Sequence, residues 1–338
     1  MTLDTHIKSL ITLGEKMSNF NDPILSGIIE QAYVHNNWFE QAEVKHCLSA
    51  WSKQLSAKNL IEWTSRYNFV KTENVNSIGL ILAGNIPLVG LHDLISVIIT
   101  NNKALVKLSS KDSILMKYVI ETLYQIDEDY KHRIEIIERI QNPDAIIATG
   151  SNNSSRYFET YFGKYPNIIR KNRNSIALLD GKETKVQLEG LASDVFRYYG
   201  LGCRNITKVY VPKNYNLETI FKAFESFEHV MGNNKYKNNY DYNCTLLLMN
   251  KVPFLTNNFI MLKEDETLHA PTATVHIERY SDNKDLQKKV NALDTKKIQC
   301  ISSDNIDIKD AINLGQCQQP NLWDYADNID TIDFLLAL

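Results

Sequence analysis

The sequence has few of the residues that define several special protein classes. It has 13 glycines and 8 prolines among 338 residues, which excludes a collagen-like or low-complexity chain. It has only five cysteines, an odd number without a CxxC pair or a histidine at metal-ligand spacing, so neither a disulfide scaffold nor a metal site is expected. We interpret these cysteines as reduced thiols of a cytoplasmic protein: Cys47, Cys203, Cys244, Cys300 and Cys317.

An excess of charge of one sign and a long uninterrupted apolar run are also missing. Lysine and arginine number 37 against 40 acidic residues, a net charge of -3, which argues against nucleic acid or anionic lipid as a partner. The start MTLDTHIKSLITLGEK lacks the basic and apolar regions of a secretory signal. The apolar stretch 78–100 is interrupted by polar residues and a proline, which favours a strand, a turn and a helix over a membrane span.

The apolar pattern predicts helices first and then alternating strands and helices. Apolar residues recur every three or four positions over residues 1 to about 70, which predicts an N-terminal helical cap. From Ser77, short apolar runs such as IGLILAG, ALVKLS and DAIIATG alternate with helical segments, which predicts a doubly wound, mostly parallel α/β sheet. In the second half, strands are expected at 207–212, 244–249, 259–262 and 273–280, with a helix at 218–230 and a last helix and strand near 288–302. The length suggests two domains.

Cys203 is the candidate nucleophile. It stands in YYGLGCRNITKVYVP, between a predicted helix and a predicted strand, and Gly200 and Gly202 would let the backbone approach a ligand closely. The reactive form of cysteine is the thiolate, and the charge of Arg204 would favour it if the side chain pointed inward. The alternative is a small buried apolar residue, because free cysteine is among the most buried residue types.

Polar residues at the ends of predicted strands are candidate ligand contacts. Asn85 follows the strand IGLILAG and could donate a hydrogen bond to an oxyanion, or satisfy the local backbone instead. Lys107 ends the next strand, where ligands of open α/β sheets usually bind, although a solvated surface lysine has the same pattern. Thr149, Gly150 and Ser151 could hold a phosphate at a helix start, and Ser151 could equally be a simple N-cap.

Several common catalytic motifs are missing from the sequence. GxGxxG, GxxxxGK[ST], HExxH and GxSxG do not occur, so the Rossmann dinucleotide, P-loop, zincin and serine-hydrolase interpretations lack their key residues. His269 and His276 could assist as bases, or could be structural.

Taken in chain order, the segments GNIP, VKLS, ATGS, GLGCRNITKVYVP and DETLHAPTATVHIERY resemble the aldehyde dehydrogenase superfamily, and specifically the acyl-CoA reductases of the LuxC family. The resemblance covers roughly residues 75 to 325. It implies an aldehyde dehydrogenase-like α/β fold with two doubly wound domains behind the N-terminal helical cap. The expected boundaries are 1–195 for the helices and the dinucleotide-binding domain and 196–312 for the cysteine-bearing catalytic domain. A tail, 313–338, would pack on the cofactor domain or on a partner subunit.

The resemblance also implies roles for individual residues. Cys203 matches the family nucleophile, and Asn85 matches the side chain that stabilises the oxyanion together with the Cys203 amide. Lys107 matches a residue at the adenosine ribose, and Thr149, Gly150 and Ser151 match the segment near the pyrophosphate. The segment LHAPTATV matches the motif that bounds the nicotinamide ribose. His269 takes the place of an aromatic residue in it, and Glu266 is a possible hydroxyl acceptor.

Two departures from the superfamily pattern indicate the reaction. Where oxidising aldehyde dehydrogenases have a water-activating glutamate, this chain runs RKNRNSIALLDG without a carboxylate at that place, which favours reduction of an acyl thioester. Ser110, followed by Lys111, stands where NAD-preferring relatives often have a carboxylate that repels a 2′-phosphate, so we expect NADPH rather than NAD.

The resulting hypothesis is an NADPH-dependent reductase that converts a fatty acyl-CoA to an aldehyde through a Cys203 acyl-enzyme. By analogy with the family, we also expect a homo-oligomer and an acyl-activating partner protein. The alternatives are a reductase of another activated acyl group, a plain aldehyde dehydrogenase, a non-catalytic binding or assembly member of the superfamily, and a thioesterase or acyltransferase that uses Cys203 with His269.

Overall fold

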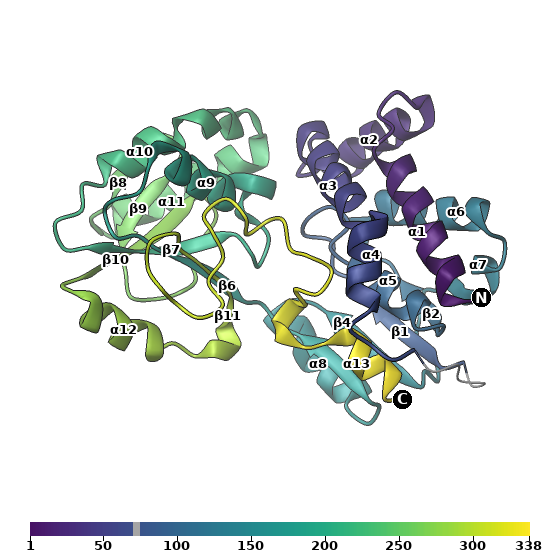
Figure 1. Cartoon of the computed structure of the whole chain (residues 1–338). Helices are drawn as coiled ribbons and strands as arrows, with labels where there is room; N and C mark the ends of the chain where they lie inside the picture. Colours follow the sequence, from purple (N-terminus) through teal and green to yellow (C-terminus); the bar gives the residue numbers. More distant parts are fainter. Residues whose placement is uncertain (70–74) are drawn as a thin grey trace. The chain divides into compact units, whose positions relative to one another are not determined.

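The computed structural model describes residues 1–69 and 75–338 and divides the chain into two compact units (Figure 1). The first unit comprises residues 1–172 and 321–338, and the second comprises residues 173–320. The sequence-based boundary at 195/196 therefore differs from the structural one by about one strand and one helix, since β6 (Asn174–Leu178) and α9 (Lys185–Phe196) belong to the second unit. The tail is also divided, because residues 313–320 belong to the second unit.

The first unit begins with the four helices that the apolar spacing predicts: α1 (Leu3–Met17), α2 (Pro23–His35), α3 (Gln41–Gln54) and α4 (Ala57–Thr64). Three of them have side-chain N-caps, because Thr2, Asp22 and Ser56 each accept a hydrogen bond from a backbone N–H of the first turn. Their apolar faces are buried, with α1 packed against α3 and α6 (Ser113–Ile126). The helical N-terminal region is therefore confirmed.

A five-stranded parallel sheet forms the centre of the first unit. Its order is β3-β2-β1-β4-β5, and the strands are β1 (Ser77–Ile81), β2 (Lys103–Lys107), β3 (Ile134–Ile136), β4 (Ala145–Thr149) and β5 (Asn167–Arg170). The helices α5 (Leu91–Ile99), α6, α7 (Tyr130–Arg133) and α8 (Asn152–Phe162) connect the strands. The apolar runs of β1 and β4 are buried on both faces, as expected of central parallel strands.

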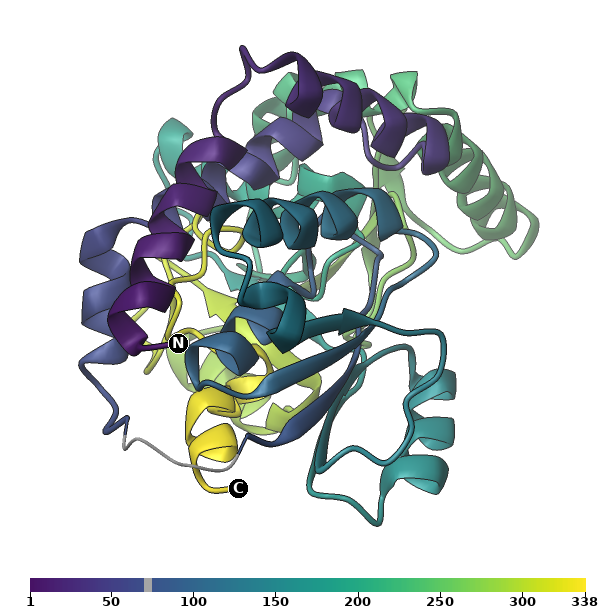
Figure 2. The same ribbon diagram turned by 90° about the vertical axis from the view of Figure 1, so that its right-hand side faces the viewer.

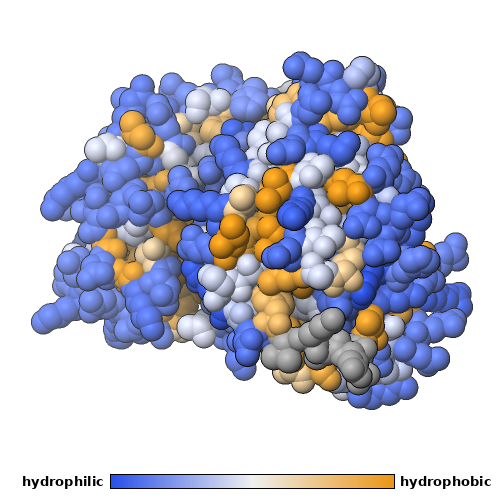
Figure 3. Space-filling model, turned by 45° about the vertical axis from the view of Figure 1, so that its right-hand side comes forward, coloured by the Kyte–Doolittle hydropathy of each residue, from blue (hydrophilic) through white to orange (hydrophobic). Residues whose placement is uncertain are grey.

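The apolar stretch 78–100 forms β1, a turn and α5, as the polar interruptions predict. Among the residues that the structure describes, we find no helix with both the length and the apolar content needed to span a bilayer. The face of the molecule shown in Figure 3 is mostly hydrophilic, with hydrophobic side chains in separate small groups.

The end of the chain returns to the first unit. The short helix α13 (Thr331–Leu336), drawn in yellow in Figure 2, packs against α5. His92 of α5 contacts the carbonyl oxygen of Leu322 through Nε2 at 2.8 Å, and the indole N–H of Trp63 donates to the Tyr325 hydroxyl at 2.7 Å. The final residues are thus fastened to helices α4 and α5 by buried polar contacts.

The second unit contains a six-stranded sheet in the order β11-β6-β7-β10-β9-β8. Its further strands are β7 (Ile206–Pro212), β8 (Leu255–Thr256), β9 (Met261–Glu264), β10 (Thr274–Tyr280) and β11 (Ile298–Ser302), all parallel to their neighbours except β8. The helices are α9, α10 (Glu218–Phe224), α11 (Asn234–Met249) and α12 (Asn283–Asn291), with 3-10 turns η1 (Arg197–Gly200), η2 (Glu225–Gly232) and η3 (Thr295–Lys297). Both units therefore have the doubly wound α/β architecture that the sequence predicts.

The prediction of a strand at 244–249 is wrong, because CTLLLM forms the last turns of α11. The helix begins at the polar segment before it, where the Asn233 side chain accepts hydrogen bonds from the N–H groups of Lys235 and Tyr236. The run ends on the surface, with Leu248 and Met249 exposed. A short apolar run has the same local pattern in a buried strand and in a helix end, so the pattern cannot distinguish them.

Candidate active site

Cys203 lies in the second unit, in the loop between η1 and β7, and its side chain is exposed. The predicted position between a helix and a strand is confirmed, and the alternative of a buried apolar cysteine is wrong for this residue. Among the other cysteines of the described residues, Cys47 and Cys317 are buried, and Cys244 and Cys300 are partly exposed.

The chain makes an unusual turn just before Cys203. Tyr198, Tyr199 and Gly200 all have positive φ angles, of 52°, 59° and 74°. This conformation is costly for a tyrosine, so it persists only where surrounding contacts enforce it, and such strain concentrates at functional sites. Both tyrosine side chains are buried, which anchors the turn.

Asn205 ties the Cys203 loop to the end of α9. Its buried side-chain N–H₂ donates to the carbonyl oxygens of Asp194 at 2.9 Å and Arg197 at 2.9 Å. Carbonyl groups at the end of a helix have no backbone N–H of a following turn to accept from, so the Asn205 side chain takes the place of that donor. Its Oδ1 accepts a hydrogen bond from the Gly202 N–H at 2.8 Å. The backbone on the N-terminal side of the candidate nucleophile is therefore held by a side chain that follows it in the sequence.

Asp194 fastens the same region to residues 315–317. Its two carboxylate oxygens accept hydrogen bonds from the N–H groups of Gly315 at 2.7 Å and Cys317 at 3.0 Å. Burial raises the pKa of Asp194 to about 6, although these backbone N–H groups act in the opposite direction. The Cys317 thiol, also buried, hydrogen-bonds Cys300, and this contact lowers the pKa of the Cys300 thiol and raises that of Cys317.

The raised pKa of Asp194 predicts a pH-dependent contribution to stability. Because the folded protein binds this proton more tightly than the unfolded chain does, the contribution is complete below about pH 4 and is lost as the pH rises through 6. We expect the free energy of unfolding of wild type, relative to Asp194→Asn, to fall by about 2–3 kcal/mol between pH 4 and pH 7. Urea unfolding of both proteins at several pH values measures this difference. A difference that is constant over the range would contradict the prediction.

Glu266 and His269 lie in the loop between β9 and β10, and both are exposed. The buried Lys208 of β7 donates through Nζ to the Glu266 carbonyl oxygen at 2.5 Å and pairs with the Glu278 carboxylate. The Thr207 hydroxyl donates to the Leu268 carbonyl oxygen at 2.9 Å, and His269 Nδ1 lies 3.3 Å from Asn174 Oδ1. This loop is thus attached to the start of β7, the strand that follows Cys203.

His276, the other histidine considered as a possible base, packs in the interior of the second unit. It is buried in β10, and its Nδ1 contacts the Thr267 carbonyl oxygen at 2.9 Å. Burial lowers the pKa of His276, so the ring is neutral over most of the physiological pH range.

The other candidate residues gather at one edge of the sheet in the first unit. Asn85 follows β1 and is exposed, Lys107 is the exposed last residue of β2, and Thr149 is the last residue of β4. These three strands are parallel neighbours, with Ile81 of β1 in register with Lys107 and with Ala148, so their carboxyl ends meet at the same edge. Open α/β sheets bind ligands at this edge.

Two serines complete this edge. Ser151 accepts a hydrogen bond from the Ser154 N–H at 3.2 Å, so it is the N-cap of α8, as the simpler interpretation predicts. Ser110 is exposed in the loop after β2, and its carbonyl oxygen contacts His35 Nε2 at 2.6 Å. Gly84 lets the Asn85 turn approach this loop, because a Cβ at that position would lie 2.5 Å from Ser109 Oγ.

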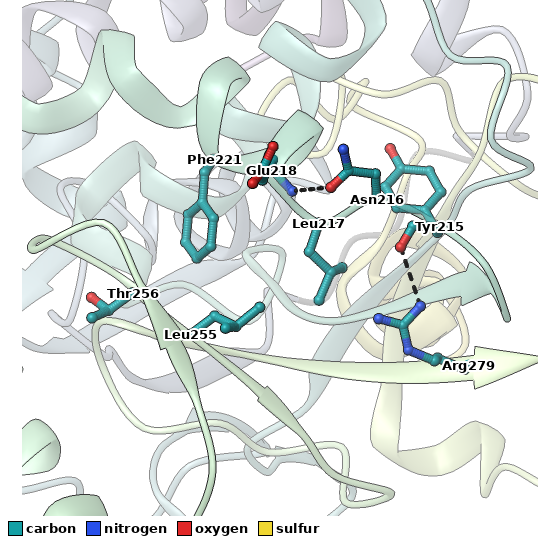
Figure 4. Close-up of a pocket in the computed structure, with 8 residues that line it drawn as sticks. All are labelled: Tyr215, Asn216, Leu217, Glu218, Phe221, Leu255, Thr256 and Arg279. Atoms are coloured by element: carbon teal, nitrogen blue, oxygen red, sulfur yellow. Dashed lines mark hydrogen bonds between the residues drawn. The ribbon is translucent and has the colours of Figure 1, made fainter.

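A pocket of about 480 Å³ lies at a different place in the second unit (Figure 4). It is lined by residues of the segment after β7, by β8 and by Arg279, which donates to the Tyr215 carbonyl oxygen at 3.2 Å. Cys203 precedes β7, whereas this pocket follows it. A strand of seven residues spans about 20 Å, so the pocket is not next to the candidate nucleophile.

Several residues that shape the site could not be recognised from the sequence pattern. Asn205, Lys208 and Asp194 have no motif, and their roles depend on contacts with other segments of the chain. A polar residue inside an otherwise apolar strand, such as Lys208 in TKVYVP, is a signal that could have been used, since a buried lysine requires a partner.

The fold is similar to that of aldehyde dehydrogenases. An Escherichia coli NADP-dependent enzyme superposes with a TM-score of 0.68 at 11% sequence identity, covering 94% of this chain and 76% of the other. A Mycobacterium tuberculosis aldehyde dehydrogenase solved with NAD⁺ superposes with a TM-score of 0.65 at 13% identity, covering 93% of this chain and 76% of the other. The predicted aldehyde dehydrogenase-like fold is therefore confirmed.

Sequence comparison gives the family. A long-chain acyl-protein thioester reductase of Aliivibrio fischeri is 23% identical over 168 residues, which are 45% of this chain but only 35% of that protein. The matched segment thus spans about a third of the curated relative's length. The model of the family described as acyl-CoA reductase (LuxC) matches residues 30–231, more than half of the chain and including Cys203. This chain, with its exposed cysteine between η1 and β7, belongs to the LuxC acyl-CoA reductase family.

Proposed function

We propose that the protein reduces a fatty acyl-CoA thioester to an aldehyde through an acyl-enzyme on Cys203, with NADPH as the reductant. The observation that carries this proposal is the exposed Cys203 thiol, in a loop whose backbone is anchored by Asn205, in a chain of the LuxC family. An accessible thiol on an anchored loop is what a covalent mechanism requires of its nucleophile.

In the proposed mechanism, the Cys203 thiolate attacks the thioester carbonyl carbon. A bond forms from sulfur to carbon, the bond from carbon to the CoA sulfur breaks, and CoA leaves as its thiolate. NADPH, when bound, supplies the hydride that reduces the acyl-enzyme. The resulting thiohemiacetal then releases the aldehyde and regenerates the Cys203 thiolate. The resemblance to the superfamily implies that the Asn85 amide and the Cys203 N–H are the hydrogen-bond donors to the substrate oxygen, which carries negative charge in both tetrahedral states.

The carboxyl edge of the first unit's sheet fits a nicotinamide dinucleotide. Lys107 is an exposed cation at the end of β2, suited to the adenosine ribose, and the start of α8 at Ser151 suits a phosphate. Ser110 and Lys111 are both exposed and bring no negative charge, which supports a 2′-phosphate and hence NADPH. On the second unit, Glu266 and His269 are exposed on an anchored loop and are proposed to bound the nicotinamide ribose.

The segment that carries the water-activating glutamate in oxidising relatives supports reduction over hydrolysis. Its first four residues, 170–173, form the end of β5 and the connection to β6, and Arg170 is buried against Asp93. These four residues include no carboxylate that could remove a proton from water, which supports an acyl-enzyme that persists until it is reduced.

The test is to incubate the protein with a mixture of acyl-CoAs of different chain length and to measure its intact mass, without and then with NADPH or NADH. We expect an acyl adduct on the Cys203 peptide that disappears with release of aldehyde when NADPH is added. Acyl transfer to water without a reductant would indicate a thioesterase instead. A protein that forms no adduct and binds no nicotinamide cofactor would be a non-catalytic member of the family.

Replacement of Asn85 by alanine or by aspartate tests its proposed role. Both variants lose the side-chain N–H donor, and we expect kcat for acyl-CoA reduction to fall by about 10²–10³-fold, as for other oxyanion donors. Because Asn85 is exposed, the variants should fold normally. The measurement is steady-state kinetics, with circular dichroism as a control for folding. An unchanged kcat in both variants would exclude Asn85 from the oxyanion site.

A further inference from the structure

Ser175 stands at a double irregularity in the sheet of the second unit. It is a fully buried residue of β6, which lies between β7 and β11. On the β7 side, Ser175 pairs with Ile206 but the next residue pairs with Lys208, so β7 has one extra residue. On the β11 side, β11 advances by three residues, from Ile298 to Ile301, while β6 advances by two, so β11 also has one extra residue. Such bulges often lie next to active sites, where they redirect nearby groups.

The Ser175 hydroxyl connects the two flanking strands at this point. Its Oγ lies 2.9 Å from the Cys203 carbonyl oxygen, 3.2 Å from the Cys300 backbone nitrogen and 2.9 Å from Cys300 Sγ. A carbonyl oxygen can only accept, so the single hydroxyl hydrogen points to Cys203. The Cys300 N–H, and the thiol when protonated, therefore donate to the serine oxygen. Ser175 thus replaces backbone ladder bonds that the two bulges interrupt.

These contacts hold the candidate nucleophile from its C-terminal side. The Asn205 side chain accepts a hydrogen bond from the Gly202 N–H, and the Ser175 hydroxyl donates to the Cys203 carbonyl oxygen. The peptide groups before Gly202 and after Cys203 are therefore both anchored. The direction of the Cys203 Cα–Cβ bond, along which the exposed thiol projects, follows from the position of this anchored backbone.

We infer that Ser175 is a positioning residue that sets the orientation of the Cys203 thiol without touching the substrate. This inference rests on the proposed function of Cys203. A misplacement of a reacting group by about 1 Å can cost roughly 10²-fold in rate, so a lost anchor should reduce kcat. A released Cys203 carbonyl oxygen can also turn toward its own sulfur, where it disfavours the thiolate.

The experiment compares Ser175→Ala with Ser302→Ala. Ser302 is a matched control, because it is fully buried in β11 of the same sheet and its hydroxyl has no hydrogen-bond partner within residues 1–69 and 75–338. The first readout is the pH profile of alkylation by iodoacetamide, followed at the Cys203 peptide by mass spectrometry. The second is the separation of kcat from KM with acyl-CoA and NADPH.

For Ser175→Ala we expect an alkylation midpoint about one pH unit higher, which makes alkylation about tenfold slower below the midpoint. We also expect kcat to fall by about 10–100-fold, with KM within about twofold of wild type. Ser302→Ala should match wild type in both readouts. A wild-type profile in Ser175→Ala would overturn the inference, and so would an equal change in Ser302→Ala.

A second variant tests the inference if Ser175→Ala does not fold, and the alkylation readout separates the inference from the proposed function. If Ser175→Ala does not fold, Ser175→Cys, which is similar in size but a weaker hydrogen-bond donor, should shift the midpoint in the same direction. A wild-type profile in that variant would overturn the inference. Alkylation needs no acyl substrate, so a shifted profile in a protein that fails to reduce any acyl-CoA would reject the proposed function and retain the positioning role of Ser175.

Discussion

Replacement of Cys203 by alanine is expected to abolish the acyl adduct and, with it, the formation of aldehyde from acyl-CoA and NADPH. The variant has no nucleophile that can accept the acyl group, so the reaction loses its covalent route rather than one contribution to the barrier. Intact-mass measurement after incubation with acyl-CoA should show the unmodified protein. NADPH consumption should fall to the rate seen without acyl-CoA.

The matched control for this variant is Cys244→Ala. Cys244 is a partly exposed thiol on α11, so it reports on non-specific acylation of an accessible cysteine. We expect this control to keep the adduct and the wild-type rate of aldehyde formation. If Cys203→Ala reduced acyl-CoA as fast as wild type, Cys203 would not be the nucleophile, and Cys300, the other partly exposed thiol of the second unit, would be the next to test.

Replacement of Arg170 by methionine is expected to cause the largest loss of stability. Arg170 Nη1 lies 2.6 Å from Asp93 Oδ2, both side chains are buried, and Arg170 Nη2 also donates to the Thr331 hydroxyl at 3.0 Å. Removal of the cation leaves the Asp93 carboxylate buried without its charged partner, which typically costs about 3–5 kcal/mol. The same change removes the hydrogen bond between α13 and β5, while the packing of α13 against α5 remains. Urea unfolding of the full chain should show the loss.

Lys171→Met is the matched control, because Lys171 is the next residue and forms an exposed ion pair with Glu159 at 2.8 Å. Exposed pairs contribute about 0–1 kcal/mol, so this variant should be close to wild type. The double variant Asp93→Leu/Arg170→Met should recover part of the loss, because no uncompensated charge remains. If Arg170→Met were no less stable than Lys171→Met, the buried pair would not be a major support of the first unit.

The fold was largely predictable because its signals are local. The alternation of apolar and polar residues in 1–70 and in IGLILAG, ALVKLS and DAIIATG predicts the helices and parallel strands that the structure contains. The failure at CTLLLM has a physical cause: a run of five apolar residues and one threonine fits a buried strand and a helix end equally well, and only the polar residues before it, capped by Asn233, decide for a helix.

The domain boundaries depended on contacts that no local pattern encodes. The segment 173–195 has the same strand-and-helix pattern as the segments before it, yet it joins the second unit because β6 pairs with β7 and β11. Residues 321–338 join the first unit through buried polar contacts such as Arg170 to Thr331, which are 161 residues apart in the chain.

The sequence by itself determined most of the order of helices and strands, with the exception of 244–249. It also determined the place of Cys203 between a helix and a strand, and the placement of Asn85, Lys107 and Thr149 at the ends of parallel strands. These features follow from the period of the apolar residues and from the chain direction within a parallel sheet. Only the tertiary structure decided which residues hold the nucleophile in place. Ser175 contacts Cys203 and Cys300 across 28 and 125 residues of chain, and the two bulges that bring them together arise from strand pairing. Because a hydrogen bond depends on distances of a fraction of an ångström, such a contact is specified by packing of the whole unit and not by any local spacing.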